Sequence, residues 1–177
     1  VFITLLSFQL KAQDRCAVPK ILEDREKKHP SLSTENFENW LDNKKIEQKI
    51  SRSKSNSFIV QIPVVFHIIH NGEPIGTGGN VLKTRIDRQL EILNEDFNRL
   101  NADSIDTLTE FKALGANLEI QFVYAKQSPD GQETSGIVRL PGSQSTYSYQ
   151  QRAILSSESY WPAEDFLNIW VADLAGG

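Results

Sequence analysis

The chain has 177 residues, 39% of them hydrophobic, which is enough for one ordinary domain with a buried core and a smaller appendage. Its formal net charge is −4 and its 19 basic residues are scattered, so the composition excludes the electrostatic footprint of a nucleic-acid-binding protein. No apolar stretch approaches the roughly 20 residues that cross a bilayer, and the sequence therefore predicts no membrane span.

Residues 1–12 are predicted to be the tail of a secretion signal. Val1 to Phe8 form an apolar run, and Ala12 supplies a small residue ahead of a cleavage point before Gln13. A short buried strand is the alternative, but charged residues follow from Lys11 instead of a polar turn. The run therefore predicts a secreted or extracellular protein, with bacterial export expected. The chain contains no methionine, so we also expect it to be a fragment.

Cys16 is the sole cysteine, and its position leaves several fates open. A disulfide needs a partner in residues or chains outside this sequence. A lipid anchor is disfavoured, because Asp14 and Arg15 are charged where a lipobox has small uncharged residues. A third interpretation is a zinc ligand, since a thiolate is a strong zinc donor and the neighbouring guanidinium of Arg15 favours the ionised form.

Residues 13–57 differ in composition from the rest of the chain and predict a small helical segment. Two charged amphipathic stretches, 21–28 and 35–50, are separated by Pro30, which blocks continuation of the first helix. Ser33 or Thr34 is suited to cap the second helix. The apolar stripe of that helix is narrow, so we expect the helix to pack against another part of the protein.

Residues 51–57 contain no apolar side chain, and nothing in them offsets the entropy of ordering the backbone. Arg52 and Lys54 are exposed targets for proteolysis. The stretch is predicted to be a cleavable linker, and an ordinary solvated linker explains it equally well.

The folded core is predicted to occupy residues 58–177 as an α/β domain. Residues 58–70 alternate with one wholly apolar face, as in a strand that is buried on at least one side, and Pro63 should lie at an edge, a bulge or a partly paired position. A helix is predicted over roughly 81–100, followed by strands at 118–125 and 166–172. Strand, long helix and strand indicate a crossover in a mixed, largely parallel twisted sheet with a backing helix. The long stretch between the last two strands is predicted to be a loop.

The residues present do not make a complete active site. His67 and His70 have an H-x-x-H spacing, but residues three apart on a strand point to opposite faces and cannot readily share one ion. Glu95 and Asp96 diverge by about 100° on a helix and do not form an acid/base pair. A G-x-S-x-G elbow and a phosphate-binding loop are also absent from the sequence.

Four sequence blocks, in order, carry a resemblance to a known family. They are Ile62-Pro63-Val64-Val65-Phe66-His67-Ile68-Ile69-His70-Asn71-Gly72, Leu93 to Asn101, Pro129-Asp130-Gly131 with Thr134-x-Gly136-Ile137-x-Arg139, and Leu167 to Leu174. Together they resemble the pappalysin family of metzincin zinc peptidases. The resemblance covers nearly all of residues 58–177, with Ala175 standing where relatives tend to have glycine.

The resemblance implies a secreted zinc metalloendopeptidase made as an inactive precursor, with protein or peptide substrates. Residues 58–177 would be the N-terminal part of its catalytic domain. In the family, zinc is held by a helix with the motif H-E-x-x-H-x-x-G-x-x-H, and the zinc-activated water attacks the peptide carbonyl. This sequence lacks that motif, so we expect the zinc ligands and the general base beyond Gly177, and no catalytic residue is assigned in this chain. Calcium is a second ion to consider.

The resemblance also implies a role for Cys16. Arg15-Cys16-Ala17 matches an Arg-Cys-Gly type motif of the family's pro-segments, whose thiolate takes the place of water on the zinc. Residues 13–57 would then be a cysteine-switch pro-segment, released by cleavage near residues 52–57. Two other interpretations stay open: an exported, non-catalytic binding or adhesion module that uses the loop around Thr146 to Tyr149, and an inactive relative of the peptidases.

Overall fold

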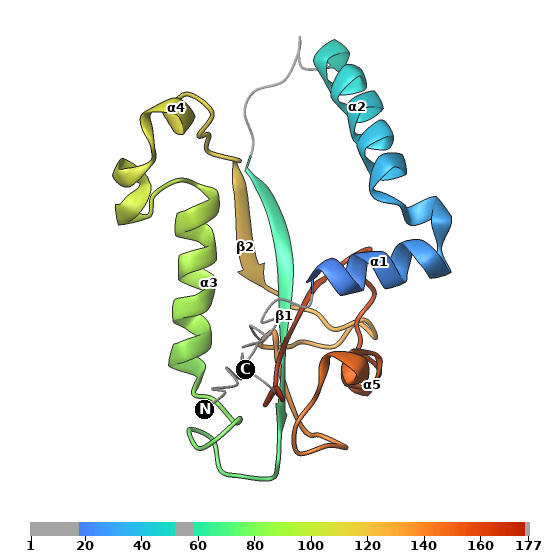
Figure 1. The fold of residues 1–177 in the computed structure, drawn as a ribbon. Coiled ribbons are helices and arrows are strands. Elements are labelled where there is room, and N and C mark those ends of the chain that lie inside the picture. The colour runs from blue at the N-terminus through green and yellow to red at the C-terminus, as the bar shows by residue number, and fades with distance from the viewer. Residues whose placement is uncertain (1–17, 52–58, 176–177) are drawn as a thin grey trace, which may run out of the picture. The chain divides into compact units, whose positions relative to one another are not determined.

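A computed structural model of the chain describes residues 18–51 and 59–175 (Figure 1). These residues fall into two compact units, one on each side of the boundary between Ser55 and Asn56. The predicted signal tail at residues 1–12, Cys16, and residues 52–57 of the predicted linker lie outside the described residues. Each unit is described by itself below.

The N-terminal unit consists of two helices separated by a break, as the sequence predicts. It consists of α1 (Val18–Lys28), η1 (Pro30–Leu32) and α2 (Thr34–Ser51). Ser33 caps α2, because its Oγ accepts a hydrogen bond of 3.2 Å from the backbone N–H of Asn36. Glu26 of α1 reinforces this start: its carboxylate accepts from both the N–H and the hydroxyl of Thr34, each at 2.8 Å. These hydrogen bonds lower the pKa of the Glu26 carboxyl.

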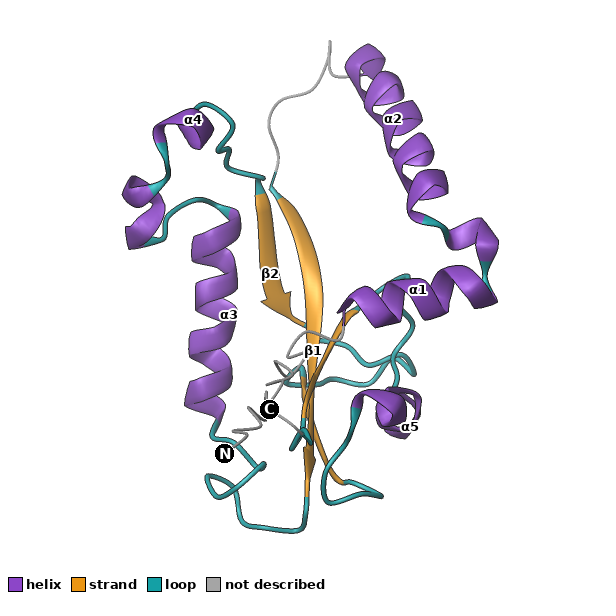
Figure 2. Ribbon diagram, in the orientation of Figure 1, coloured by secondary structure: helices purple, strands orange, loops and turns teal. Residues whose placement is uncertain are grey.

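The second unit is built on a parallel sheet around one long central strand (Figure 2). The strands are β1 (Val60–His70), β2 (Ile120–Tyr124), β3 (Ile137–Pro141) and β4 (Leu167–Val171). Each of the other three pairs with β1 in parallel. The predicted α/β fold with a largely parallel sheet is confirmed.

Strands β2 and β3 follow one another along the same edge of β1. Val60 donates its N–H to the carbonyl of Glu119 at 2.9 Å, and Phe66 donates to that of Gly136 at 2.8 Å. Because alternate residues of a strand direct their backbone groups to alternate edges, these two even-numbered residues face the same edge. The ladder with β4 therefore runs along the other edge, from Val64 to Ile68. Pro63 precedes that ladder, which agrees with its predicted position where the strand is only partly paired.

Helix α3 (Lys83–Phe97) covers one face of the sheet. The core beneath it consists of Val64, Phe66, Ile68, Ile86, Leu90 and Phe122. The spacing of the apolar residues predicts one stripe along the helix, made of Ile86, Leu90, Leu93, Phe97 and Leu100. This prediction is wrong at the last member, because Leu100 is 73% exposed. The helix ends at Phe97, and Arg99 takes a positive φ of 55° that turns the chain away.

Polar side chains join α3 to the neighbouring strand. The Asn94 amide donates to the carbonyl of Phe122 at 2.9 Å and accepts from its N–H at 2.8 Å. Asn98, one turn later, donates to the carbonyl of Ile120 at 2.9 Å. The helix thus satisfies backbone groups of β2 that have no strand beside them, which fixes helix and strand together.

Several short elements lie outside the strands and the helix that the sequence predicts, either in the predicted loop between the last two strands or between α3 and β2. They are β3 and the helical segments η3 (Ala102–Asp106), α4 (Thr109–Lys112), η4 (Tyr149–Gln151) and α5 (Arg152–Glu158). The second face of β1 is covered as well, because Val65, His67 and Ile69 are buried. No helix among residues 18–51 and 59–175 has the length and apolar character needed to cross a membrane.

Candidate functional site

Cys16, the one site residue that the sequence assigns, lies outside the described residues. Within residues 18–51 and 59–175, no group of three or more His, Cys, Asp or Glu side chains is placed to hold a metal ion. The donor set of the described residues therefore does not fit a zinc site.

The two histidines of β1 serve separate purposes, as the strand geometry predicts. His67 is fully buried, and its ring stacks on Trp170 with centroids 5.1 Å apart. His70 stands at the end of the strand, where its Nδ1 accepts a hydrogen bond of 3.0 Å from the N–H of Gly72. The pair does not form a metal site.

His67 is held by an amide from the neighbouring strand. Its Nε2 lies 2.9 Å from Oδ1 of Asn168. That amide is oriented because its Nδ2 donates to the carbonyl of Trp161 at 2.9 Å, so Oδ1 accepts and Nε2 of His67 carries the proton. Burial lowers the pKa of His67, with the Asn168 hydrogen bond acting in the opposite direction. The imidazole is therefore neutral at physiological pH.

Two buried polar atoms remain beside this pair. Within the part of the chain that the structure describes, Nδ1 of His67 and Nε1 of Trp170 have no hydrogen-bond partner. In this tautomer Nδ1 of His67 is an acceptor, whereas Nε1 of Trp170 is a donor. Both atoms belong to the rings that stack across β1 and β4.

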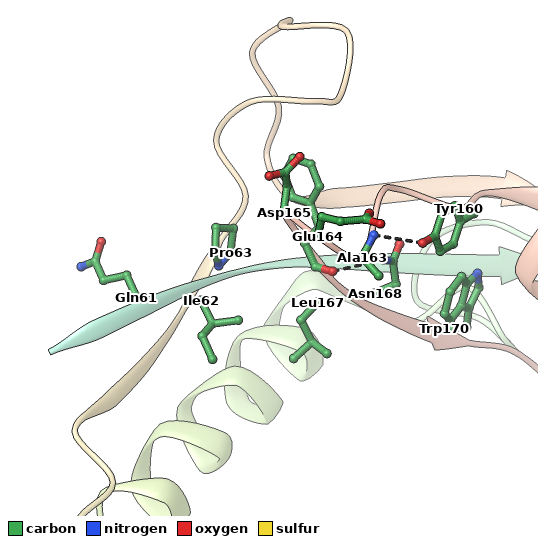
Figure 3. A pocket seen from close by; sticks show the side chains of 11 residues that line it. Gln61, Ile62, Pro63, Tyr160, Ala163, Glu164, Asp165, Leu167, Asn168 and Trp170 are labelled. Carbon is green, nitrogen blue, oxygen red and sulfur yellow. Dashed lines mark hydrogen bonds between the residues drawn. The ribbon is translucent and has the colours of Figure 1, made fainter. Parts of the chain in front are cut away.

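A hollow of about 580 Å³ lies where β4 begins (Figure 3). The turn before β4 forms one side of it, and in this turn the Ala163 N–H donates to the Tyr160 hydroxyl at 3.0 Å. The lining includes the edge of β1, apolar rings and two carboxylates, contributed by Gln61, Pro63, Glu164, Asp165, Phe166 and Trp170. The arrangement offers apolar contact and negative charge to a ligand.

The residues of this hollow are not among the site residues predicted from the sequence. A signal was available in Tyr160-Trp161-Pro162, an aromatic pair next to a proline shortly before a predicted strand. Trp161 packs edge-on against Phe166 with ring centroids 4.9 Å apart, and this contact shapes the turn. Asn168 gave no signal, because its role depends on a backbone turn that only the fold creates.

In fold and sequence the chain is similar to metzincin peptidases of the pappalysin family, which confirms the resemblance seen in the four sequence blocks. The solved structures that match the chain include those of one such peptidase, mirolysin. Mature mirolysin of Tannerella forsythia with a cleaved peptide matches with 35% identity and a TM-score of 0.60, over 68% of this chain and 44% of that one. Mirolysin in complex with a compound gives the same identity and TM-score over 67% and 44%.

The precursor of the same protein matches more of the chain. A promirolysin mutant of Tannerella forsythia is 29% identical with a TM-score of 0.59, over 86% of this chain and 50% of that one. Residues 56–175 make up only about two thirds of the chain, so this match includes residues of the N-terminal unit. The chain spans half or less of the length of these relatives. No protein-family model matches the chain, and no curated protein matches it significantly.

Proposed function

We propose that this chain is the N-terminal part of the precursor of a secreted zinc metallopeptidase of the pappalysin family, with protein or peptide substrates. The observation that carries the proposal is the similarity to promirolysin over 86% of the chain, which exceeds the 68% matched by mature mirolysin. In this proposal residues 1–12 are the signal tail, 13–57 the pro-segment, and 58–177 the first part of the catalytic domain.

The described residues contribute a scaffold to this activity. Their donor set does not fit zinc, so the ligands and the general base are assigned to none of them. The long strand β1, packed on α3 by a continuous apolar core, provides a rigid sheet. Rigid elements are suited to carry a catalytic site, since catalytic geometry tolerates little displacement.

Cys16 is the residue that we propose keeps the precursor latent. Its thiolate would occupy a coordination position on the zinc, and the adjacent Arg15 favours the ionised thiol that a metal binds. Ala17 has fewer accessible backbone conformations than the glycine of related motifs. The approach of the Cys16 thiolate to the zinc would therefore depend on the backbone conformation of the residues beside it. Cleavage near Arg52 in the linker would release the segment.

Latency of the full-length precursor tests the proposal. We would measure peptidase activity before and after limited trypsin treatment, for the wild type, Cys16→Ala and the control Ala17→Gly. The wild type and the control are expected to be latent until treated, whereas Cys16→Ala is expected to be active beforehand. Wild-type latency in the Cys16→Ala variant would overturn the role of Cys16, and a treated wild type without activity would overturn the enzymatic proposal.

The structure gives no support to the alternative of an adhesion module that uses the loop around Thr146 to Tyr149. Tyr147, at the centre of that loop, is only 2% exposed. Its hydroxyl donates to the Glu158 carboxylate, with oxygen distances of 2.8 and 2.9 Å. Tyr147 also continues the sheet, since its N–H donates to the carbonyl of Asp173 at 2.8 Å. A partner has little access to this side chain.

A further inference from the structure

The first half of β1 has an open edge. Val60 directs its N–H to β2, and the carbonyl of Val64 accepts from the Ala125 N–H at 2.9 Å on the same side. Alternation along the strand turns the N–H and C=O of Gln61 to the opposite edge, where the ladder with β4 starts only at the Val64 and Leu167 pair. Among the described residues, the backbone of Gln61 has no hydrogen-bond partner.

The hollow at the start of β4 lies beside this edge (Figure 3). Pro63, Phe166 and Trp170 give it apolar walls. Glu164 and Asp165 are exposed on its rim, and within residues 18–51 and 59–175 neither carboxylate has a hydrogen bond or ion pair. The hollow therefore combines three features. They are a backbone donor and acceptor without partners, an apolar wall, and two negative charges that no described cation neutralises.

We propose that this edge binds an extended segment of a partner polypeptide that carries an arginine or lysine side chain. The partner backbone would add to β1 by pairing with the N–H and C=O of Gln61, as in other cases of strand addition. Its basic side chain would reach Glu164 and Asp165, while the flanking residues cover the apolar walls. Pro63 has no N–H to offer, so the pairing is short and its selectivity comes from charge.

A second copy of the chain is a poorer occupant than a basic segment. Edge-to-edge pairing of two copies would bring the Glu164 and Asp165 carboxylates of both into one interface, where like charges oppose association. A basic segment instead meets complementary charge. This proposal goes beyond the peptidase assignment and does not depend on it.

Two capped peptides serve as probes for the whole 177-residue chain. One is acetyl-Thr-Val-Arg-Val-Thr-amide, and the other has glutamate in place of the arginine. We expect the arginine peptide to bind at least about fivefold more tightly at low salt in calorimetric titration, with a smaller difference at high salt. It should also slow hydrogen exchange of the Gln61 amide. Equal affinities for the two peptides, or no measurable binding of the arginine peptide, would overturn the proposal.

Two matched variants separate the backbone contact from the charge contact. Gln61→Pro removes the N–H at the open edge but leaves the β2 ladder, whereas Gln61→Ala keeps the N–H. The first should lose binding and the second should retain it. The double variant Glu164→Gln with Asp165→Asn should bind both peptides alike. The proposal is contradicted by equal binding in Gln61→Pro and Gln61→Ala, by retained arginine selectivity in the double variant, or by a dimer of the free chain that Gln61→Pro abolishes.

Discussion

The imidazole of His67 lies on the indole of Trp170, with ring centroids 5.1 Å apart and ring planes inclined by 19°. The two residues are direct partners in the parallel register of β1 and β4. The stack therefore buries a titratable ring at the contact that joins the two strands, and it ties the stability of the sheet to the protonation of His67.

Acidification is predicted to destabilise the sheet through His67. Burial keeps the folded-state pKa below the ordinary value of 6.5, so the unfolded chain takes up a proton at a pH where the folded chain does not. The stabilising contribution is fully present above about pH 6.5 and is lost progressively as the pH falls through the lower, folded-state pKa. Urea unfolding followed by tryptophan fluorescence at several pH values between 7.5 and 5 measures this slope.

The matched variants for this prediction are His67→Gln and His70→Gln. His67→Gln removes the titrating ring, so the part of the slope that His67 contributes should disappear even though the variant is less stable at pH 7.5. His70→Gln leaves His67 in place and should keep that part. Identical slopes in the wild type and His67→Gln would show that burial of His67 is not the source.

Replacement of Asn168 by alanine is predicted to destabilise the unit that contains the sheet. The side chain of Asn168 bonds the His67 ring and both the N–H and the carbonyl of Trp161. Its loss leaves these groups without partners, which we expect to lower the free energy of unfolding by about 3 kcal/mol. The control is Asn117→Ala, because Asn117 makes an exposed bond to the N–H of Glu119 and should matter by less than about 1 kcal/mol. Similar losses in both variants would contradict this account.

Gly136→Ala is predicted to cost more than Gly72→Ala. Both glycines have a positive φ, of 72° and 90°. A Cβ on Gly136 would lie 3.0 Å from the N of Ala125 and from Cβ of Tyr124, whereas a Cβ on Gly72 would meet nothing within 4 Å. We expect about 3 kcal/mol for Gly136→Ala, from strain and crowding together, and about 1 kcal/mol for Gly72→Ala, from strain alone. If denaturant unfolding showed equal losses in the free energy of unfolding for the two variants, crowding around Gly136 would be ruled out as a cause.

Local sequence pattern is sufficient to predict those helices and strands whose buried face follows from the periodicity of apolar residues. The alternation along β1 and the spacing of Ile86 and Leu90 on α3 predicted the two faces that form the core, and the structure confirms them. The start of β2 was predicted two residues too early, because Glu119 takes a positive φ of 55° that no sequence pattern announces.

The missed elements and the missed site have a common cause. Strand β3 has five residues, including Arg139 and Pro141, and it is a strand only because the second half of β1 offers it an edge. The hollow depends in the same way on register. Strand β4 begins at Leu167, opposite Val64, and leaves the first residues of β1 without a neighbouring strand on that edge. Such non-local pairing is invisible to short-range pattern. The assignment of Cys16 rests on motif resemblance, and it stays a prediction.

The coordination of zinc in the latent precursor tests the central claim most directly. Zinc X-ray absorption of the full-length precursor should show one sulfur ligand at about 2.3 Å among nitrogen and oxygen ligands. The sulfur should be absent from the Cys16→Ala variant and from the protein after removal of the pro-segment. A zinc site with the same ligands in the wild type and in Cys16→Ala, or a precursor that binds no zinc, would contradict the account.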